Sequence, residues 1–191
     1  MKKTAVTAAP LSPLIAERWS PRAFDANHQA TDAEVLSLIE AGRWAPSANN
    51  TQPWRFTVAR RGEGLFNAIV GTTSGFNQAW VPNASVVILV SAIKLNADGN
   101  PHRTFMFDCG LAVQNILLQA EALGLAGHVL AGFDREAMPF AAGVPEDLQV
   151  VMLVAVGKAT DASVLPEGAR ERELLERSRL PLDEIVLAGK P

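Results

Sequence analysis

The sequence has little cysteine and histidine, which form disulfides and zinc sites, and it lacks tyrosine, a common general acid. Its 191 residues include one cysteine, Cys109, and no tyrosine. A single cysteine excludes an intramolecular disulfide framework and suits a reducing compartment. The three histidines (His28, His102 and His128) and Cys109 have none of the close spacings of a zinc site, so we expect no metal centre.

Several catalytic and membrane signatures are missing as well. The chain has no Gly-x-Ser-x-Gly elbow, no Gly-Lys-Ser/Thr phosphate loop and no Gly-x-Gly-x-x-Gly turn. No apolar run approaches the ~20 residues of a membrane helix. The opening Met1–Pro10 has a short apolar stretch that leads into prolines and charges, so we expect no exported leader and a cytoplasmic protein. These absences favour a bound organic cofactor as the source of any redox or group-transfer chemistry.

The composition is that of an ordinary globular protein. Hydrophobic residues make up 48% and charged residues 19%, and the net charge is −3. A negative net charge argues against nucleic acid as the main partner. We predict one α+β domain over residues 1–191, with no internal repeat and no linker.

The expected elements follow from caps and periodicity. Ser12-Pro13 opens a short helix that ends near Arg18. Thr31 and Glu34 form a capping box for a helix that ends before Pro46. The other predicted elements are strands at 55–59, 85–92 and 150–157, a long helix at 102–123 ended by Gly124, a charged helix at 167–177 and a surface loop at 71–82.

A polar loop joins the second helix to the first strand. It carries five amide or hydroxyl side chains between Pro46 and Pro53, namely Ser47, Asn49, Asn50, Thr51 and Gln52. Neutral donors and acceptors suit a flat ligand rich in heteroatoms better than a metal or a simple anion. An ordinary polar turn after a proline-terminated helix explains the composition equally well.

Two arginine clusters stand near the ends of the chain, within Arg18-Trp19-Ser20-Pro21-Arg22 and Arg177-Ser178-Arg179. Arginine forks match phosphate oxygens with paired hydrogen bonds. Each cluster alone is typical of a solvated, salt-bridged helix end. Together, in a protein of net negative charge, they predict one monophosphate pocket.

The chain resembles the nitroreductase family of flavin-mononucleotide (FMN) oxidoreductases. The similarity covers nearly the whole chain, in family order: residues 18–24, Ala45-Pro46-Ser47 through Gln52-Pro53-Trp54, Gly124-Leu125 leading into residues 131–134, residues 143–147 and residues 177–181. The resemblance implies a three-layer α+β fold, with a mostly antiparallel central sheet between helices, and a homodimer with an extended C-terminal tail.

The family resemblance also implies the residues that bind the cofactor. It assigns the flavin phosphate to Arg18, Ser20, Arg22, Arg177 and Arg179. Trp19, in the same segment, affects stacking or loop rigidity. The flavin ring edge and ribityl chain fall to Pro46, Ser47, Asn50 and Gln52, and the turn Leu130-Ala131-Gly132 aims backbone N–H groups at the flavin. The flavin carries the chemistry, so we expect no catalytic side chain.

The implied activity is reduction of nitroaromatics, quinones or similar flat acceptors by NADH or NADPH through FMN. Without a second nucleotide fingerprint, both substrates use one flavin face, which predicts ping-pong turnover. Other reductions on the same fold (of an enal, a semialdehyde or a halide-bearing substrate), an FMN-storage protein and an unliganded scaffold remain alternatives.

Overall fold

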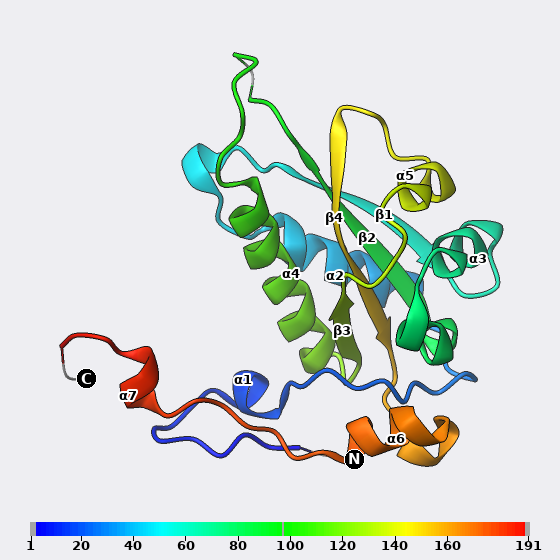
Figure 1. Cartoon of the computed structure of the whole chain (residues 1–191), viewed down its shortest axis with the longest axis vertical. Helices are drawn as coiled ribbons and strands as arrows, with labels where there is room; N and C mark the ends of the chain where they lie inside the picture. The colour runs from blue at the N-terminus through cyan, green and yellow to red at the C-terminus, as the bar shows by residue number, and fades with distance from the viewer. Residues whose placement is uncertain (1–2, 97, 190–191) are drawn as a thin grey trace.

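The computed structural model describes residues 3–96 and 98–189. A four-stranded sheet in the order β1-β2-β4-β3 forms its centre, and every neighbouring pair is antiparallel. Figure 1 shows helices on both sides of this sheet. The strands are β1 (Trp54–Arg60), β2 (Val86–Ile93), β3 (Ala126–Leu130) and β4 (Leu148–Gly157).

The central strand β2 is apolar except at Ser91, because both of its faces are covered. Val86, Ile88 and Val90 belong to one buried cluster, whereas Val87 and Leu89 belong to another. Successive side chains of a strand point to opposite faces, so this alternation marks one core on each side of the sheet. The buried strand predicted at 85–92 is therefore confirmed, and the fold has the three layers expected.

Two long helices cover one face of the sheet. They are α2 (Asp32–Arg43) and α4 (Phe105–Ala122), which pack on one another and on the sheet. The predicted capping box of α2 is present, since the Glu34 N–H donates to Thr31 Oγ1 at 3.2 Å and the Thr31 N–H to Glu34 Oε2 at 2.7 Å. Helix α4 begins three residues later than predicted and ends before Gly124, whose φ of +70° closes it.

Shorter helices cover the other face. These are α3 (Gly64–Gly71), α5 (Ala137–Ala142) and α6 (Glu167–Leu174), together with 3₁₀ turns at 75–79, 81–83 and 162–164. The sequence predicted neither α3 nor α5 nor strand β3. The surface loop predicted at 71–82 is wrong, because Trp80 and Val81 within it are fully buried. The ring centroid of Trp80 lies 4.4 Å from that of His128 and 6.1 Å from that of Phe24, with the rings tilted in both pairs. Both partners are far from Trp80 in the sequence.

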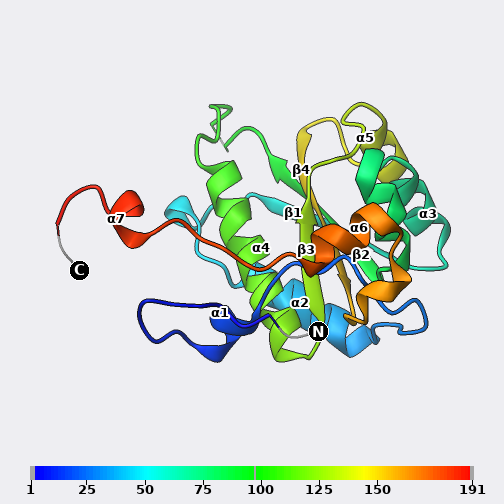
Figure 2. The same ribbon diagram turned by 60° about the horizontal axis from the view of Figure 1, so that its bottom comes forward.

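The N-terminal segment and the segment that follows α6 meet beside α1 (Pro13–Glu17), where Arg177 donates to Lys3 O and Ala16 O. Ser12 and Pro13 open α1 as predicted. Helix α6 ends at Leu174, three residues before the predicted Arg177, and a short exposed helix α7 (Leu182–Ile185) follows. Figure 2 shows α7 standing away from the rest of the chain. No helix among the described residues is long and apolar enough to cross a membrane.

Cys109 lies fully buried in α4, as expected of a core thiol. Burial and the neighbouring Asp108 raise the pKa of its thiol to about 12. A thiol with this pKa is protonated at neutral pH and is a poor nucleophile.

Candidate functional site

Three arginines converge beside the end of α1. A cavity of about 230 Å³ is lined by Arg18, Arg177 and Arg179 together with Gln114 and apolar residues of the N-terminal segment. Burial lowers the pKa of Arg18 below its usual value, and the charges of Arg177 and Arg179 lower it further, while Glu121 opposes this. The structure therefore gathers like charges from both predicted clusters, and Arg18 Nη1 also donates to Ser20 Oγ at 3.4 Å.

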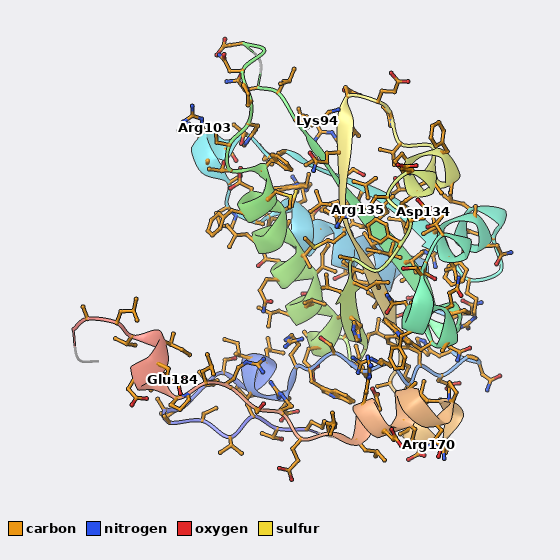
Figure 3. All side chains as sticks on the ribbon, in the orientation of Figure 1. Lys94, Arg103, Asp134, Arg135, Arg170 and Glu184 are labelled. Atoms are coloured by element: carbon orange, nitrogen blue, oxygen red, sulfur yellow. The ribbon has the colours of Figure 1, made fainter. Side chains whose placement is uncertain are left out.

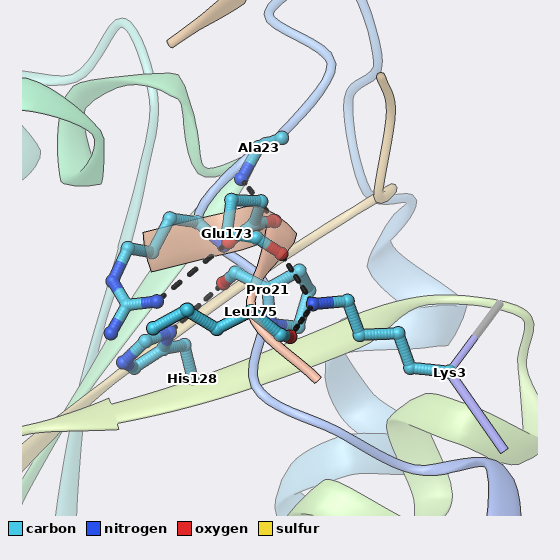
Figure 4. Close-up of polar contacts among 7 residues, drawn as sticks. Lys3, Pro21, Ala23, His128, Glu173 and Leu175 are labelled. Carbon is cyan, nitrogen blue, oxygen red and sulfur yellow. Dashed lines mark hydrogen bonds and ion pairs between the residues drawn. The ribbon is translucent and has the colours of Figure 1, made fainter. Parts of the chain in front are cut away.

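Backbone contacts hold this arginine cluster together. Arg177 Nη1 donates to Ala16 O at 2.7 Å and to Lys3 O at 2.5 Å. Lys3 Nζ donates back to the carbonyls of Glu173 and Leu175 (Figure 4). It also lies 4.7 Å from the centre of the Trp19 ring. Arg177 is thus partly a structural residue, whereas Arg179 is exposed and contacts the carbonyl of its neighbour Ser178.

Arg22 lies apart from the arginine cluster, although the family resemblance groups the two. Its guanidinium is 3.7 Å from the Glu173 carboxylate, which is 1% exposed, and stands over the Phe76 ring. The same carboxylate accepts the backbone N–H groups of Arg22, at 2.9 and 3.0 Å, and of Ala23, at 3.1 Å (Figure 4). Burial lowers the pKa of Arg22 and Glu173 opposes that shift. A carboxylate therefore already balances the Arg22 charge.

Two groups that no sequence pattern indicated, one buried and one half-buried, support the segment 18–22. One is Glu173, which ties α6 to that segment. The other is His128, whose Nδ1 lies 2.9 Å from Pro21 O, so that the ring N–H donates to this carbonyl. Burial lowers the pKa of His128 to about 4 and keeps the ring neutral at neutral pH. No local pattern marks either residue, because each finds its partner more than 100 positions away.

The polar loop after α2 has an unusual backbone. Asn49, Asn50 and Gln52 have φ values of 51°, 56° and 48°, in the left-handed region that favours glycine. Within the loop, the Gln52 N–H donates to Ser47 Oγ and Gln52 Nε2 donates to Asn50 O, each at 3.0 Å. Pro46, Asn50 and Gln52 are exposed, and Ser47 is half-buried. Strained backbone of this kind clusters at functional sites.

The turn Leu130-Ala131-Gly132 follows β3 directly. The carbonyl of Gly132 accepts from the Ser74 N–H at 3.0 Å and from Asn77 Nδ2 at 3.1 Å. A Cβ on Gly132 would lie 2.3 Å from Asn77 Nδ2, so any other residue here would have to displace the Asn77 side chain. Leu130 is buried and Ala131 is exposed. The segment 71–82 therefore fixes the turn in place.

The polar loop lies at the start of α4, whereas the arginine cluster lies toward its end and its cavity reaches Gln114 in the middle of the helix. Arg18 interacts with Glu121 near the end of the helix, and the Ala48 N–H donates to Asp108 near its start. Thirteen helical residues span roughly 20 Å. In agreement, Figure 1 shows α1 at one end of α4 and the loop before β1 at the other. None of the residues that line the arginine cavity belongs to the loop.

Comparison with known proteins agrees with this architecture. A family model described as "Nitroreductase family" matches residues 15–158. A protein of Archaeoglobus fulgidus, provisionally named an NADH dehydrogenase or NAD(P)H nitroreductase, is 35% identical over 153 residues, covering 78% of this chain and 84% of that protein. An oxygen-insensitive NADPH nitroreductase of Helicobacter acinonychis is 24% identical over 211 residues, covering 91% of this chain and 93% of that protein.

Solved structures are similar over almost the full length. The crystal structure of an oxidoreductase containing FMN has a TM-score of 0.90 and 34% identity, and the alignment covers 97% of this chain and 94% of that one. A provisionally named nitroreductase of Desulfovibrio desulfuricans, in complex with FMN, has a TM-score of 0.75 and 28% identity, covering 95% and 99%. With a family model that spans most of its length and relatives of this similarity, the chain belongs to the nitroreductase family.

Proposed function

We propose that this protein is a homodimeric, FMN-dependent NAD(P)H oxidoreductase that reduces nitroaromatics, quinones or similar flat, electron-poor acceptors. The observation that carries this proposal is the convergence of Arg18, Arg177 and Arg179 on one cavity. Positive charges gathered around one cavity favour an anion between them. The FMN in the two similar solved structures supports a flavin phosphate as that anion.

The donor set fits one end of FMN. Guanidinium groups and the Ser20 hydroxyl match the oxygens of a monophosphate. A cavity of about 230 Å³ is smaller than the ~300–1,000 Å³ that encloses a drug-sized ligand, so it suits the phosphate and leaves the ring outside. We assign the phosphate to Arg18, Ser20, Arg177 and Arg179, and leave Arg22 out because Glu173 balances its charge.

The other predicted residues would act at the ring. Bound FMN supplies the redox chemistry, taking a hydride from the nicotinamide and passing electrons to the acceptor. Pro46, Ser47, Asn50 and Gln52 would contact the ring edge and ribityl chain, and the turn 130–132 would offer backbone N–H groups. Fixed donors of this kind stabilise the charge that develops on a reduced ring without reorganising. No protein acid or base is required, since water delivers the proton.

The absence of any polar-loop residue from the lining of the arginine cavity supports a site shared by two subunits. Exposed apolar side chains on α4 and the C-terminal segment are available for such an interface: Met106, Phe107, Leu180, Leu182, Ile185 and Leu187. Sedimentation of the flavin-loaded protein at micromolar concentration should therefore give a dimer. A flavin-loaded monomer would refute the shared site.

The test of the proposed activity uses the purified protein. Chromatography of the flavin released on denaturation should identify FMN, and anaerobic NADH or NADPH should bleach the yellow protein within seconds. Steady-state lines at several fixed quinone concentrations should be parallel, as in ping-pong turnover. Bound flavin that stays yellow would instead indicate a storage protein, and a colourless protein that does not take up FMN would refute cofactor binding altogether.

A further inference from the structure

Two side chains hold the strained polar loop in place: that of His102, just before α4, and that of Asp108, in the first turn of α4. The Ala48 N–H donates to Asp108 Oδ1 at 3.3 Å, and His102 Nε2 lies 2.7 Å from Thr51 Oγ1. Both partners are buried, Asp108 to 1% exposure and His102 to 9%. The left-handed residues 49 and 50 lie between the two anchored positions, and residue 52 lies just beyond them. In Figure 3 the labelled Arg103, which lies between His102 and Thr104 in the sequence, is beside this loop.

Thr104 joins the two anchors into one network. Its hydroxyl lies 3.0 Å from Asp108 Oδ2 and 3.5 Å from His102 Nδ1. The Thr51 hydroxyl donates to Ala48 O at 2.8 Å, so its oxygen is left to accept the Nε2–H of His102. The neutral Nε2–H tautomer of His102 satisfies the contact with Thr51, whereas the Thr104 hydroxyl gives its one proton to Asp108 and only packs against Nδ1 of His102. The two anchors, Asp108 with Ala48 and His102 with Thr51, therefore meet at Thr104.

Such a network is needed because left-handed backbone is unfavourable for residues other than glycine and persists only where the surroundings hold it. Asparagine tolerates this region better than most residues, but Gln52 gains no such relief. The internal bonds from Gln52 to Ser47 and Asn50 close the loop on itself without tying it to the sheet or α4. Arg55 Nη1 of β1 donates to Gln52 O at 3.1 Å, and the contacts to Asp108 and His102 supply the tie to α4 and to the segment before it.

We infer that His102, Thr104 and Asp108 are positioning residues, which hold the loop 47–52 in the left-handed shape that faces the flavin ring. This inference rests on the proposed function for its ligand, but the anchoring itself does not. The arginine cluster, which we assign to the flavin phosphate, lies toward the other end of α4. Loosening the loop should therefore disturb the surroundings of the flavin ring while FMN stays bound. A defect in the arginine cluster should do the opposite.

The test uses variants that differ by one hydroxyl or one charge. Thr51→Val and Thr104→Val remove a hydroxyl at nearly constant shape, Thr51→Ser and Thr104→Ser restore it, and Asp108→Asn keeps an acceptor oxygen. In the cofactor-free protein, amide hydrogen exchange of a peptide covering the loop should become about tenfold faster in the two valine variants and return in the serine variants. Exchange in β2 serves as the control and should stay unchanged.

In the FMN-loaded protein, the valine variants should shift the visible absorption bands and lower kcat up to about tenfold, with FMN affinity changed less than about twofold. The double variant should be no worse than the single variants, as expected for one coupled network. Unchanged exchange in both valine variants would overturn the anchoring. Faster exchange with an unaltered spectrum and kcat would overturn the positioning role. A wild-type protein that binds no flavin would refute the proposed function and the ring-facing role with it, while the exchange result would still decide the anchoring.

Discussion

Replacing Arg179 with alanine should move two properties of the protein in different directions. Arg179 is exposed, and its charge lowers the pKa of Arg18. Removing it relieves repulsion in the cofactor-free protein, so the melting temperature of that form should stay constant or rise. The same change removes one cation from the phosphate pocket. FMN affinity should therefore fall.

The size of the loss follows from the contact that disappears. A hydrogen bond to a charged group contributes about 1.5–3 kcal/mol, and about 1.4 kcal/mol is tenfold in affinity. Because Arg179 is exposed and screened by solvent, we expect a loss at the lower end of this energy range, which corresponds to a dissociation constant for FMN about tenfold larger. The loss should shrink at high salt, since the Debye length falls from about 10 Å at 0.1 M to about 3 Å at 1 M.

Arg177→Ala is the informative comparison. Its Nη1 bonds to Lys3 O and Ala16 O, so this variant should lose stability in the cofactor-free form as well as FMN affinity. Arg43→Ala serves as the control, because it removes the same charge from an exposed pair with Glu40 on α2. Flavin fluorescence titration measures affinity and thermal unfolding measures stability. Unchanged affinity in both the Arg179 and Arg177 variants, or a destabilised Arg179 variant, would refute the pocket.

Three further substitutions test the groups around the site. Glu173→Ala leaves the N–H groups of residues 22–23 without their acceptor, so it should lower the free energy of unfolding, measured in urea, by about 3 kcal/mol. Glu173→Gln should lower it less, and an equal loss of stability in the two variants would contradict this role of the carboxylate. Because the pKa of His128 is about 4 in the fold and 6.5 unfolded, the unfolded chain alone binds the proton between these pH values. Wild-type stability should thus fall by up to about 3 kcal/mol as pH drops from 6.5 to 4, and a His128→Gln variant with the same slope would refute the assignment. Gly132→Ala should displace Asn77 and cost about 1 kcal/mol by thermal unfolding, whereas an unaffected protein would mean that the turn yields easily.

The elements that the sequence predicted well are those whose signal is local. The capping box at Thr31 and the glycine stop at Gly124 involve residues a few positions apart. Strand β2 was predictable because burial on both faces leaves Ser91 as its one polar residue. The segment around Trp80 is locally polar, and its burial depends on Phe24 and His128, which no pattern near Trp80 could indicate.

The candidate site divides in the same way. Arg18 and Arg22 look alike in the sequence, four positions apart in one motif. Glu173, 151 positions after Arg22, makes them different by taking one of them into an ion pair. Within the polar loop, the Asn49-Asn50 pair is a recognisable signal for left-handed backbone, whereas Gln52 carries none. Distant partners, rather than weak local preferences, therefore limit prediction of this site.

The distance along α4 leads to a test of how the two halves of the site combine. If one chain supplies the arginines and the other the polar loop, each dimer holds two sites of mixed origin. In a heterodimer of Arg18→Ala and Ser47→Ala chains, one site then carries both defects and the other carries neither. Purified through two different affinity tags, this heterodimer should retain about half of the wild-type activity, while each variant homodimer is impaired at both sites. If each site were built within one chain, the heterodimer would combine two defective sites and no activity would return, so the measurement decides between the two arrangements.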